Sequence, residues 1–352
     1  KHWPIGRDRR RAPRGMQDMR NEMDFSELAR LSSGHAEARI VQVAVSLGLF
    51  DLFKDTELDA VSVAASIQAE PRATDLLLNA LTALGLLRKN NHFFSLSEVA
   101  AAYLVRSSAK FLGDMILFES SLWDCWGDLE KAVRTGKPAR VPDMYQGDAQ
   151  ATERFIRAMH SLVQARGDAD ILANMLDLSR VRDLLDVGSG PGTYPIHLCR
   201  RFPGLRAAIF DLPGTLKITE KFVRESGLKD RIRLVAGDYR IDPIPGKYQM
   251  AFLSNIIHAE SSEENERLMA KLFQCLEPGG RIVIKDHILD DSLTHPPVGA
   301  IFAMLMLLTT EHGRCYSFRE VREWLEKAGF KRVTETALPS PLISSLVTAE
   351  RD

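Results

Sequence analysis

Two different hydrophobic patterns divide the chain. Through residues 24–178 apolar positions recur every three or four residues, as they do in Ile40, Val41, Ala44 and Val45, and this spacing predicts amphipathic helices. From about residue 180 short apolar runs alternate with helical stretches. Such alternation predicts a mostly parallel sheet with helices on both faces. The fold class predicted is therefore α/β, with a doubly wound sheet preceded by a helical region.

The second half of the chain can be divided into individual elements. The apolar runs predict strands at 184–187, 207–212, 232–237, 250–257 and 281–289. Helices are predicted between them, at 192–202, 214–226 and 262–276. A last helix at 318–328 ends at Gly329, and two further runs, 331–338 and 343–349, can pair as an antiparallel hairpin.

Residues 58–96 combine two helices with a hairpin. The helices within 58–87 meet at a turn around Pro71, a residue favoured at the first position of a helix. Residues 86–96 read as a hairpin with Asn90 and Asn91 in the turn. This is the pattern of a winged helix, a module that often binds DNA. The second helix is rich in leucine and has few bases or amides, so packing or dimerisation is the expected role.

Composition narrows the classes of partner. The 352 residues are 45% apolar and 26% charged with a formal net charge of −1, so no overall field favours nucleic acid or a membrane. The four cysteines lack zinc or redox spacing, which indicates reduced thiols in a cytoplasmic protein. The longest apolar run, 298–308, is shorter than the roughly 20 residues of a membrane-spanning helix.

The first residues differ from the rest of the chain. Residues 1–23 are rich in arginine near their start and contain two prolines, and we expect a disordered basic tail there. The alternative is an arm that binds nucleic acid or a membrane. The patterns together predict a tail at 1–23, a winged-helix dimerisation domain at 24–110, helices bordering a substrate pocket at 111–178 and a cofactor-binding domain at 179–352.

The segment DVGSGPGT at 186–193 carries the strongest chemical signal. It lies between a predicted strand and a predicted helix, and Gly188, Gly190 and Gly192 allow a tight turn and a close approach to a ligand. Asp211 ends the next strand, where a carboxylate can accept hydrogen bonds from ribose hydroxyls. The spacing is G-x-G-x-G rather than the dinucleotide pattern G-x-G-x-x-G. A ligand with a ribose but no pyrophosphate therefore fits better than NAD.

Polar residues also follow the next two strands. Asp238 and Tyr239 come after the third strand, where the acid can accept from an adenine amino group and the ring can stack on the base. Ser254, Asn255 and His258 lie near the end of the fourth. Because ligands of open α/β sheets lie outside the carboxyl ends of the strands, these residues point to one site.

Five segments in this order resemble the motifs of class I S-adenosylmethionine-dependent methyltransferases. They are DVGSGPGT, FDLP at 210–213, GDY at 237–239, SNIIHAE at 254–260 and LEPGGRIVIKDHIL at 276–289. With the winged helix ahead of them, residues 25–352 resemble more closely the small-molecule O-methyltransferases with an N-terminal dimerisation domain. That family includes plant caffeate, flavonoid and hydroxyindole enzymes and bacterial polyketide enzymes. The resemblance implies S-adenosylmethionine as cofactor, S-adenosylhomocysteine as product, a homodimer and no metal.

The resemblance also implies roles for single residues. His258 matches the family's catalytic base, and Asp286 falls where an acid orients that histidine. A further acid of the family is replaced here by Cys315, for which Glu311 or Glu260 can substitute. The residues expected at the cofactor are Asp186, Gly188, Gly190, Gly192, Asp211, Leu212, Gly237, Asp238, Tyr239, Ser254 and Asn255.

The expected reaction is methyl transfer to a hydroxyl of an aromatic or polycyclic small molecule, with His258 taking the proton. A base in hydrogen-bond reach contributes roughly 10²–10⁴ to such a rate. An apolar acceptor pocket, with core packing as the alternative, is predicted from Trp123, Trp126, Phe155, Met159 and Met304. Three other functions stay open: methylation of carbon or nitrogen, a non-methylating relative that hydroxylates or decarboxylates, and a DNA-binding regulator that senses the cofactor.

Overall fold

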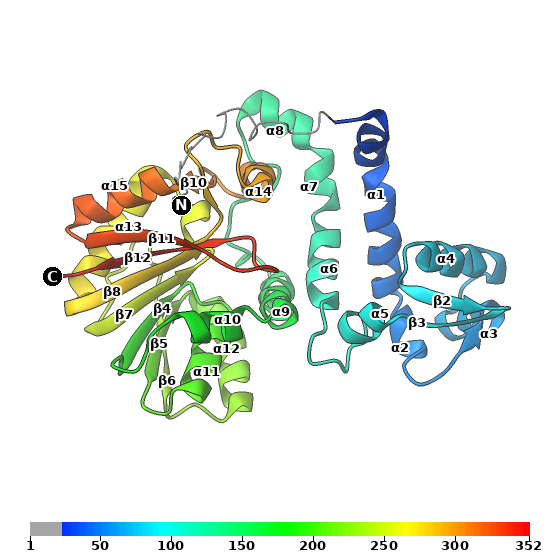
Figure 1. Cartoon of the computed structure of the whole chain (residues 1–352), viewed down its shortest axis with the longest axis horizontal. Coiled ribbons are helices and arrows are strands. Elements are labelled where there is room, and N and C mark those ends of the chain that lie inside the picture. The colour runs from blue at the N-terminus through cyan, green and yellow to red at the C-terminus, as the bar shows by residue number, and fades with distance from the viewer. Residues whose placement is uncertain (1–22) are drawn as a thin grey trace, which may run out of the picture.

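The computed structural model describes residues 23–352 (Figure 1). Except for Met23, the tail expected at 1–23 lies outside the described residues. Figure 1 shows a small helical part with a short sheet at one end of the molecule and a larger sheet flanked by helices at the other. Helices α6–α9 and α14 run between the two. None of the helices in the described part is long and apolar enough to cross a membrane.

The N-terminal part contains the predicted helix-turn-helix and hairpin. Its elements are α1 (Phe25–Ser46), α2 (Leu49–Leu52), β1 (Leu58–Asp59), α3 (Ala60–Ile67), α4 (Pro71–Ala83), β2 (Leu87–Asn90), β3 (Phe93–Leu96) and α5 (Glu98–Tyr103). Pro71 is the first residue of α4, and the Glu70 side chain caps the free amides of its first turn. Leu78 and Leu81 are fully buried, which agrees with the predicted packing role of α4, whereas Leu76 is 56% exposed.

Five helices follow α5 along the chain before the large sheet begins. They are α6 (Gly113–Ser121), α7 (Trp123–Gly127), α8 (Leu129–Thr135), α9 (Ala149–Arg166) and α10 (Asp168–Met175). Helix α6 packs against both α1 and α9. Helix α14 (Pro297–Thr309), which comes from far along the chain, contacts α7 and α8. The region that holds the predicted aromatic pocket is thus built from both halves of the sequence.

The large sheet has seven strands in the order β11-β12-β8-β7-β4-β5-β6. The strands are β4 (Asp183–Val187), β5 (Arg206–Asp211), β6 (Ile232–Ala236), β7 (Tyr248–Ser254), β8 (Leu276–Asp286), β11 (Lys331–Ala337) and β12 (Ser345–Glu350). Strands β4 to β8 are parallel, and β11 and β12 form the predicted antiparallel hairpin beside β8. The strand order reverses between β4 and β7, and ligands of doubly wound sheets bind at such a point.

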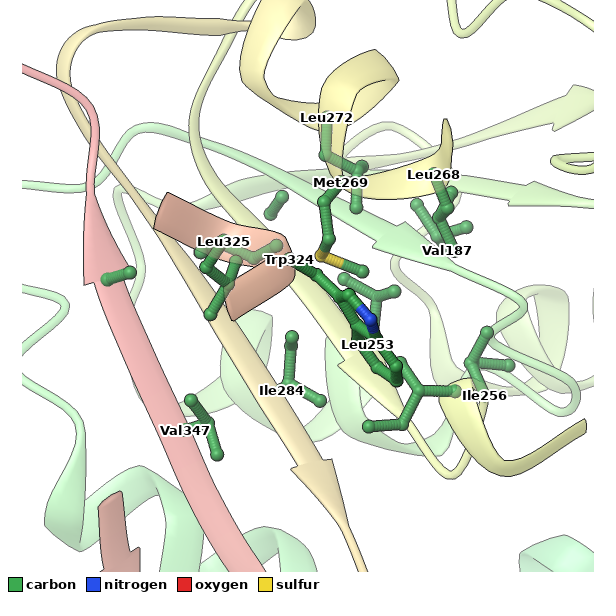
Figure 2. Close-up of a cluster of buried hydrophobic side chains, with 14 of the residues drawn as sticks. Val187, Leu253, Ile256, Leu268, Met269, Leu272, Ile284, Trp324, Leu325 and Val347 are labelled. Atoms are coloured by element: carbon green, nitrogen blue, oxygen red, sulfur yellow. The ribbon is translucent and has the colours of Figure 1, made fainter. Parts of the chain in front are cut away.

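Helices cover both faces of this sheet. Besides α10, they are α11 (Thr193–Arg201), α12 (Pro213–Ser226), α13 (Ser262–Cys275) and α15 (Phe318–Ala328). On one face, α13 and α15 bury the cluster in Figure 2, where Met269, Leu272, Trp324 and Leu325 lie against Leu253 and Ile284. On the other face, side chains of α10 and α11 pack on Leu184, Ile209 and Phe252. The predicted doubly wound architecture is confirmed.

Two strand predictions were wrong at their ends, and both errors lie at the predicted site. The strand predicted at 250–257 ends at Ser254, because Asn255 adopts a left-handed backbone with φ of +59°. A 3₁₀ turn, η1 (Ile257–Ala259), follows it. The strand predicted at 281–289 begins at Leu276 and is interrupted at His287, after which β9 (Ile288–Leu289) pairs with β10 (Tyr316–Ser317). These two breaks place His258 and Asp286 side by side.

Candidate functional site

The glycine loop between β4 and α11 depends on glycine at two positions. Gly188 has φ of +64° and Gly192 has φ of +72°, values that other residues rarely adopt. A Cβ on Gly188 would lie 2.3 Å from Cδ1 of Ile256, and one on Gly192 would lie 2.9 Å from Cδ1 of Ile209. Both the backbone conformation and the close packing therefore disfavour a side chain at these two positions.

Asp211 fixes this loop from the end of β5. One carboxylate oxygen accepts a hydrogen bond from the Gly190 amide at 2.8 Å, and the other accepts from the Leu212 amide at 2.7 Å. Its backbone oxygen accepts from the Gly237 amide at 3.0 Å, which ties the end of β6 to the same place. Asp211 is buried, and burial raises the pKa of its carboxyl to about 6.

Asp186 lies beneath the loop with an unpaired oxygen. Its Oδ2 accepts from the Ser189 hydroxyl at 2.7 Å, whereas its buried Oδ1 has no hydrogen-bond partner in the structure. Burial raises the pKa of this carboxyl to about 8. Buried acceptors are nearly always paired in folded proteins, so an orphaned one beside a glycine loop indicates a donor supplied by a ligand.

The residues after β6 are held by local contacts. The Asp238 carboxylate accepts from the Arg240 guanidinium at 2.7 Å, and although burial opposes it, this pairing lowers the pKa of Asp238. Tyr239 is only 5% exposed, and its hydroxyl donates to Oε1 of Glu260 at 2.6 Å. Little of the ring is open to solvent, and stacking of this ring on a base stays a prediction.

A histidine–aspartate pair lies at the neighbouring strand ends. His258, on η1, places Nδ1 2.7 Å from Oδ1 of Asp286 at the end of β8, and both side chains are buried. Burial works against the charge on Asp286, but the imidazoles of His258 and His287 and a backbone amide hold its pKa below the usual range. With the Nδ1 proton donated to Asp286, Nε2 of His258 is the free acceptor. The Phe302 ring of α14 lies nearly perpendicular to the imidazole, with 4.8 Å between centroids.

No second carboxylate supports His258 within residues 23–352. Cys315 is buried, and burial raises the pKa of its thiol to about 12, so it is a neutral group where the family acid was expected. Glu260 directs its carboxyl to Tyr239, and Glu311 is exposed beside His312. Neither alternative acid reaches His258, and within the described part of the chain Oδ2 of Asp286 has no hydrogen-bond partner.

The predicted pocket residues separate into two groups. Phe155 stacks on Tyr145 at 4.4 Å and meets Phe118 at 5.4 Å, and Met159 and Leu305 pack against the same cluster. Met304 is half-buried on α14 next to Leu305. Trp123 and Trp126 lie on α7 and are 37% and 39% exposed. The cluster fits both core packing and a wall of an apolar pocket.

The sequence analysis did not predict a buried cluster of charged residues around Asp168. Nζ of Lys285 lies 3.4 Å from Asp168, whose carboxylate also accepts from Arg166 and from the hydroxyl of Tyr194. Lys285 is 1% exposed and directly precedes Asp286. A lysine within the apolar run of β8 was the available signal, because a lysine is almost never fully buried unless paired.

Within the described residues, no three His, Cys, Asp or Glu side chains converge as metal ligands.

The strand order, the glycine loop and the acid after β5 together define the class I S-adenosylmethionine-dependent methyltransferase fold. A family model for the O-methyltransferase domain matches residues 126–331, and one for the O-methyltransferase dimerisation domain matches residues 29–106. The chain belongs to the S-adenosylmethionine-dependent O-methyltransferase family.

Individual relatives match along nearly the whole chain. A 3-hydroxy-5-methyl-1-naphthoate 3-O-methyltransferase from Streptomyces sahachiroi is 31% identical, over 91% of this chain and 93% of that protein. An L-tyrosine C(3)-methyltransferase from Streptomyces lavendulae is 28% identical, over 91% and 90%. The structure of human N-acetylserotonin methyltransferase in complex with S-adenosylmethionine is 22% identical, covers 95% and 99%, and has a TM-score of 0.84, which shows the shared fold.

Proposed function

We propose that this enzyme methylates a hydroxyl group of an aromatic or polycyclic small molecule and that His258 is the base that takes the hydroxyl proton. The observation that carries the proposal is the buried His258–Asp286 pair, at 2.7 Å, on the strand ends beside the glycine loop. The naphthoate enzyme supports an aromatic hydroxyl as acceptor, since its name describes methylation of such a group.

The residues of the loop fit S-adenosylmethionine. Asp186 offers an unpaired buried acceptor for a donor of the ligand, and the loop at Gly188 and Gly192 has no room for side chains. We assign the cofactor to the groups at the strand ends: Asp186, Gly188, Gly190, Gly192, Asp211, Leu212, Gly237, Asp238, Tyr239, Ser254 and Asn255. When bound, the cofactor supplies a methyl group that is already activated by its positive sulfur.

The protein then has to place the acceptor and remove one proton. The Asp286 carboxylate accepts a hydrogen bond from Nδ1–H of His258. Nε2 of the same ring is then free to take the proton of the substrate hydroxyl. The imidazolium formed in that step is stabilised by the Asp286 carboxylate, as the aspartate of a Ser-His-Asp catalytic triad stabilises its histidine. Because the pair is buried, its electrostatic interaction is stronger than it would be in water.

The acceptor is proposed to lie between the strand ends and the helices above them. Phe302 of α14 already contacts the imidazole, and Phe155 and Met159 of α9 lie in the adjoining aromatic cluster. Apolar walls with one polar reacting group are typical of pockets for flat aromatic ligands. Trp123, Trp126 and Met304 remain the proposed outer residues of this pocket.

We also propose a homodimer and a division of the chain at 24–110, 111–178 and 179–352. The break between α5 and α6, at Tyr103 and Gly113, and that between α10 and β4, at Met175 and Asp183, support these boundaries. On α1, Phe25, Leu28 and Leu31 are 83%, 57% and 56% exposed. Such a row of apolar side chains on one helix is typical of a surface covered by another protein.

The test is turnover with S-adenosylmethionine and a hydroxynaphthoate acceptor, followed by identification of the product. His258→Ala is expected to lower kcat by about 10²-fold or more, the contribution of a positioned base. A His258→Ala variant that methylates the same hydroxyl at the wild-type rate would contradict the assignment. The tyrosine relative keeps methylation of an aromatic carbon as the second candidate, and a C-methylated product would establish it.

A further inference from the structure

The turn that carries His258 is held by hydrogen bonds to its neighbours. The Asn265 side chain donates to the backbone oxygen of Ile257 at 2.8 Å, and the Tyr316 hydroxyl donates to the backbone oxygen of Glu260 at 2.6 Å. Both contacts come from elements behind the turn, α13 and β10. The turn is therefore fixed to the body of the sheet on that side.

A third contact comes from the cofactor side. The Tyr239 hydroxyl donates to Oε1 of Glu260 at 2.6 Å, and both residues are 5% exposed. Burial raises the pKa of Tyr239 well above its ordinary value, so its hydroxyl stays protonated and remains a donor. Glu260 follows His258 by two residues, and this bond thus reaches the segment that ends the catalytic turn.

The ring of Tyr239 lies against the glycine loop. Its Cε1 atom is 3.7 Å from the position that a Cβ on Gly188 would occupy, and the ring packs in one hydrophobic cluster with Ile256 and Ile257. Ile256 in turn fills the space beside Gly188, as the 2.3 Å approach to its Cδ1 shows. One side chain therefore contacts both the proposed cofactor loop and the segment carrying the proposed base.

We propose that Tyr239, through its hydrogen bond to Glu260, is a positioning residue that sets the His258 turn relative to the glycine loop. The inference rests on the proposed function, because it assigns a purpose to the separation between cofactor and base. It gives the Tyr239 hydroxyl a different task from the base stacking expected of the ring. Small errors in such a distance are costly, because transfer reactions depend on the placement of the reacting groups.

Two readouts that need no acceptor test this inference. Histidine labelled with ¹³C in the full chain gives the Cε1–H signal of His258, assigned by its loss in His258→Asn. That proton senses the nearby Phe302 ring and Asp286. Calorimetry with S-adenosylhomocysteine gives the affinity of the cofactor site. Thermal melting shows whether each variant is folded.

Tyr239→Phe and Glu260→Ala are both expected to shift the His258 signal. In Glu260→Ala, a residue outside the proposed cofactor site, S-adenosylhomocysteine should bind within about twofold of the wild-type Kd. Glu260→Gln keeps an acceptor for the hydroxyl and should retain the wild-type signal. Tyr248→Phe is the matched control: Tyr248 is 3% exposed in the same cluster, but its hydroxyl donates to Pro245 at the other end of β7. It should leave the signal unchanged.

Other results would overturn the inference. An unchanged His258 signal in Tyr239→Phe or in Glu260→Ala shows that the bond does not place the turn. The same shift in Tyr248→Phe, or a change of both readouts in Glu260→Ala, means a general disturbance of the core. Failure of the wild-type protein to bind S-adenosylhomocysteine would instead contradict the proposed function.

Discussion

Two buried aspartates of the site differ in charge for a local reason. Among residues 23–352, no hydrogen-bond partner reaches one carboxylate oxygen of Asp186 and one of Asp286. Asp286 lies beside an imidazole and accepts a backbone amide, which favours its ionised form. Asp186 has only the Ser189 hydroxyl, and burial raises its pKa to about 8. Near neutral pH, without ligand, the first is thus a carboxylate and the second is largely protonated.

The state of Asp186 predicts how stability depends on pH. Its folded pKa, about 8, lies above the ordinary value of 3.8, so the folded protein holds a proton that the unfolded chain loses. The contribution of this group to stability therefore falls as pH rises from about 4 to 8. Asp186→Asn removes the titration, and its melting temperature without ligand should exceed that of wild type at pH 8 and approach it at pH 5.

Asp177→Asn is the control for this experiment, since Asp177 is exposed and its pKa is lowered by the Ser179 hydroxyl. Its replacement should give no gain in melting temperature at pH 8. An Asp186→Asn difference that is the same at both pH values would contradict the raised pKa.

The buried Asp168–Lys285 ion pair should lose different amounts of stability depending on which partner is replaced. Asp168 has three partners, Lys285, Arg166 and Tyr194, whereas Lys285 relies on Asp168 for its carboxylate contact. Asp168→Asn leaves a buried ammonium without an anion and should cost about 3–5 kcal/mol in urea unfolding. Lys285→Met leaves Asp168 paired and should cost clearly less.

The exposed pair Arg134–Glu130 is the control, where Glu130→Gln should cost under about 1 kcal/mol. Equal losses for Asp168→Asn and Lys285→Met would contradict this account.

At the scale of elements, the sequence predicted those strands, helices and loops that depend on the local pattern of apolar residues and glycines. The apolar periods placed the strands and helices, and the glycine spacing placed the loop after β4. The ends of β7 and β8 were mispredicted because of one residue at each. Asn255 adopts a left-handed backbone, and the His287 amide donates to the Asp286 side chain. The position of α14 over the base, by contrast, is a packing of distant segments, which periodicity along the chain does not encode.

The glycine loop itself gives an element-scale prediction. Gly188→Ala puts a methyl group 2.3 Å from Ile256 in a backbone conformation with φ of +64°. We expect the loop to move and the Kd for S-adenosylhomocysteine, measured by calorimetry, to rise about tenfold or more, because strain of this kind costs roughly 1–3 kcal/mol. Gly227→Ala is the control: its φ is +74°, but nothing lies within 4 Å of the added atom. It should lose stability and keep its affinity. Equal affinities for Gly188→Ala and wild type would contradict the role of the loop.

At the scale of the whole molecule, the first half of α1 is largely exposed when only residues 23–352 are considered. The helix begins with a capping box between Asp24 and Glu27, yet nearly all of residues 25–39 are exposed. An isolated helical stretch of this length is marginal in water, and most helices are stabilised by burying an apolar face. The match of residues 29–106 to a dimerisation domain indicates what covers this face. The described chain is thus one half of the stable unit in our proposal.

This argument predicts the effect of charge on α1. Leu28 and Leu31 lie on one helical face, and replacing both with Arg should place two charges in the proposed contact. Sedimentation should then show a monomer where wild type is a dimer, and the melting temperature of the variant should lose its dependence on protein concentration. Ile241→Arg is the control, because Ile241 is 78% exposed on the loop after β6. It should sediment as wild type does. A dimer that survives both arginines would mean that the two chains meet through another surface, and the exposed leucines of α1 would then need a different partner.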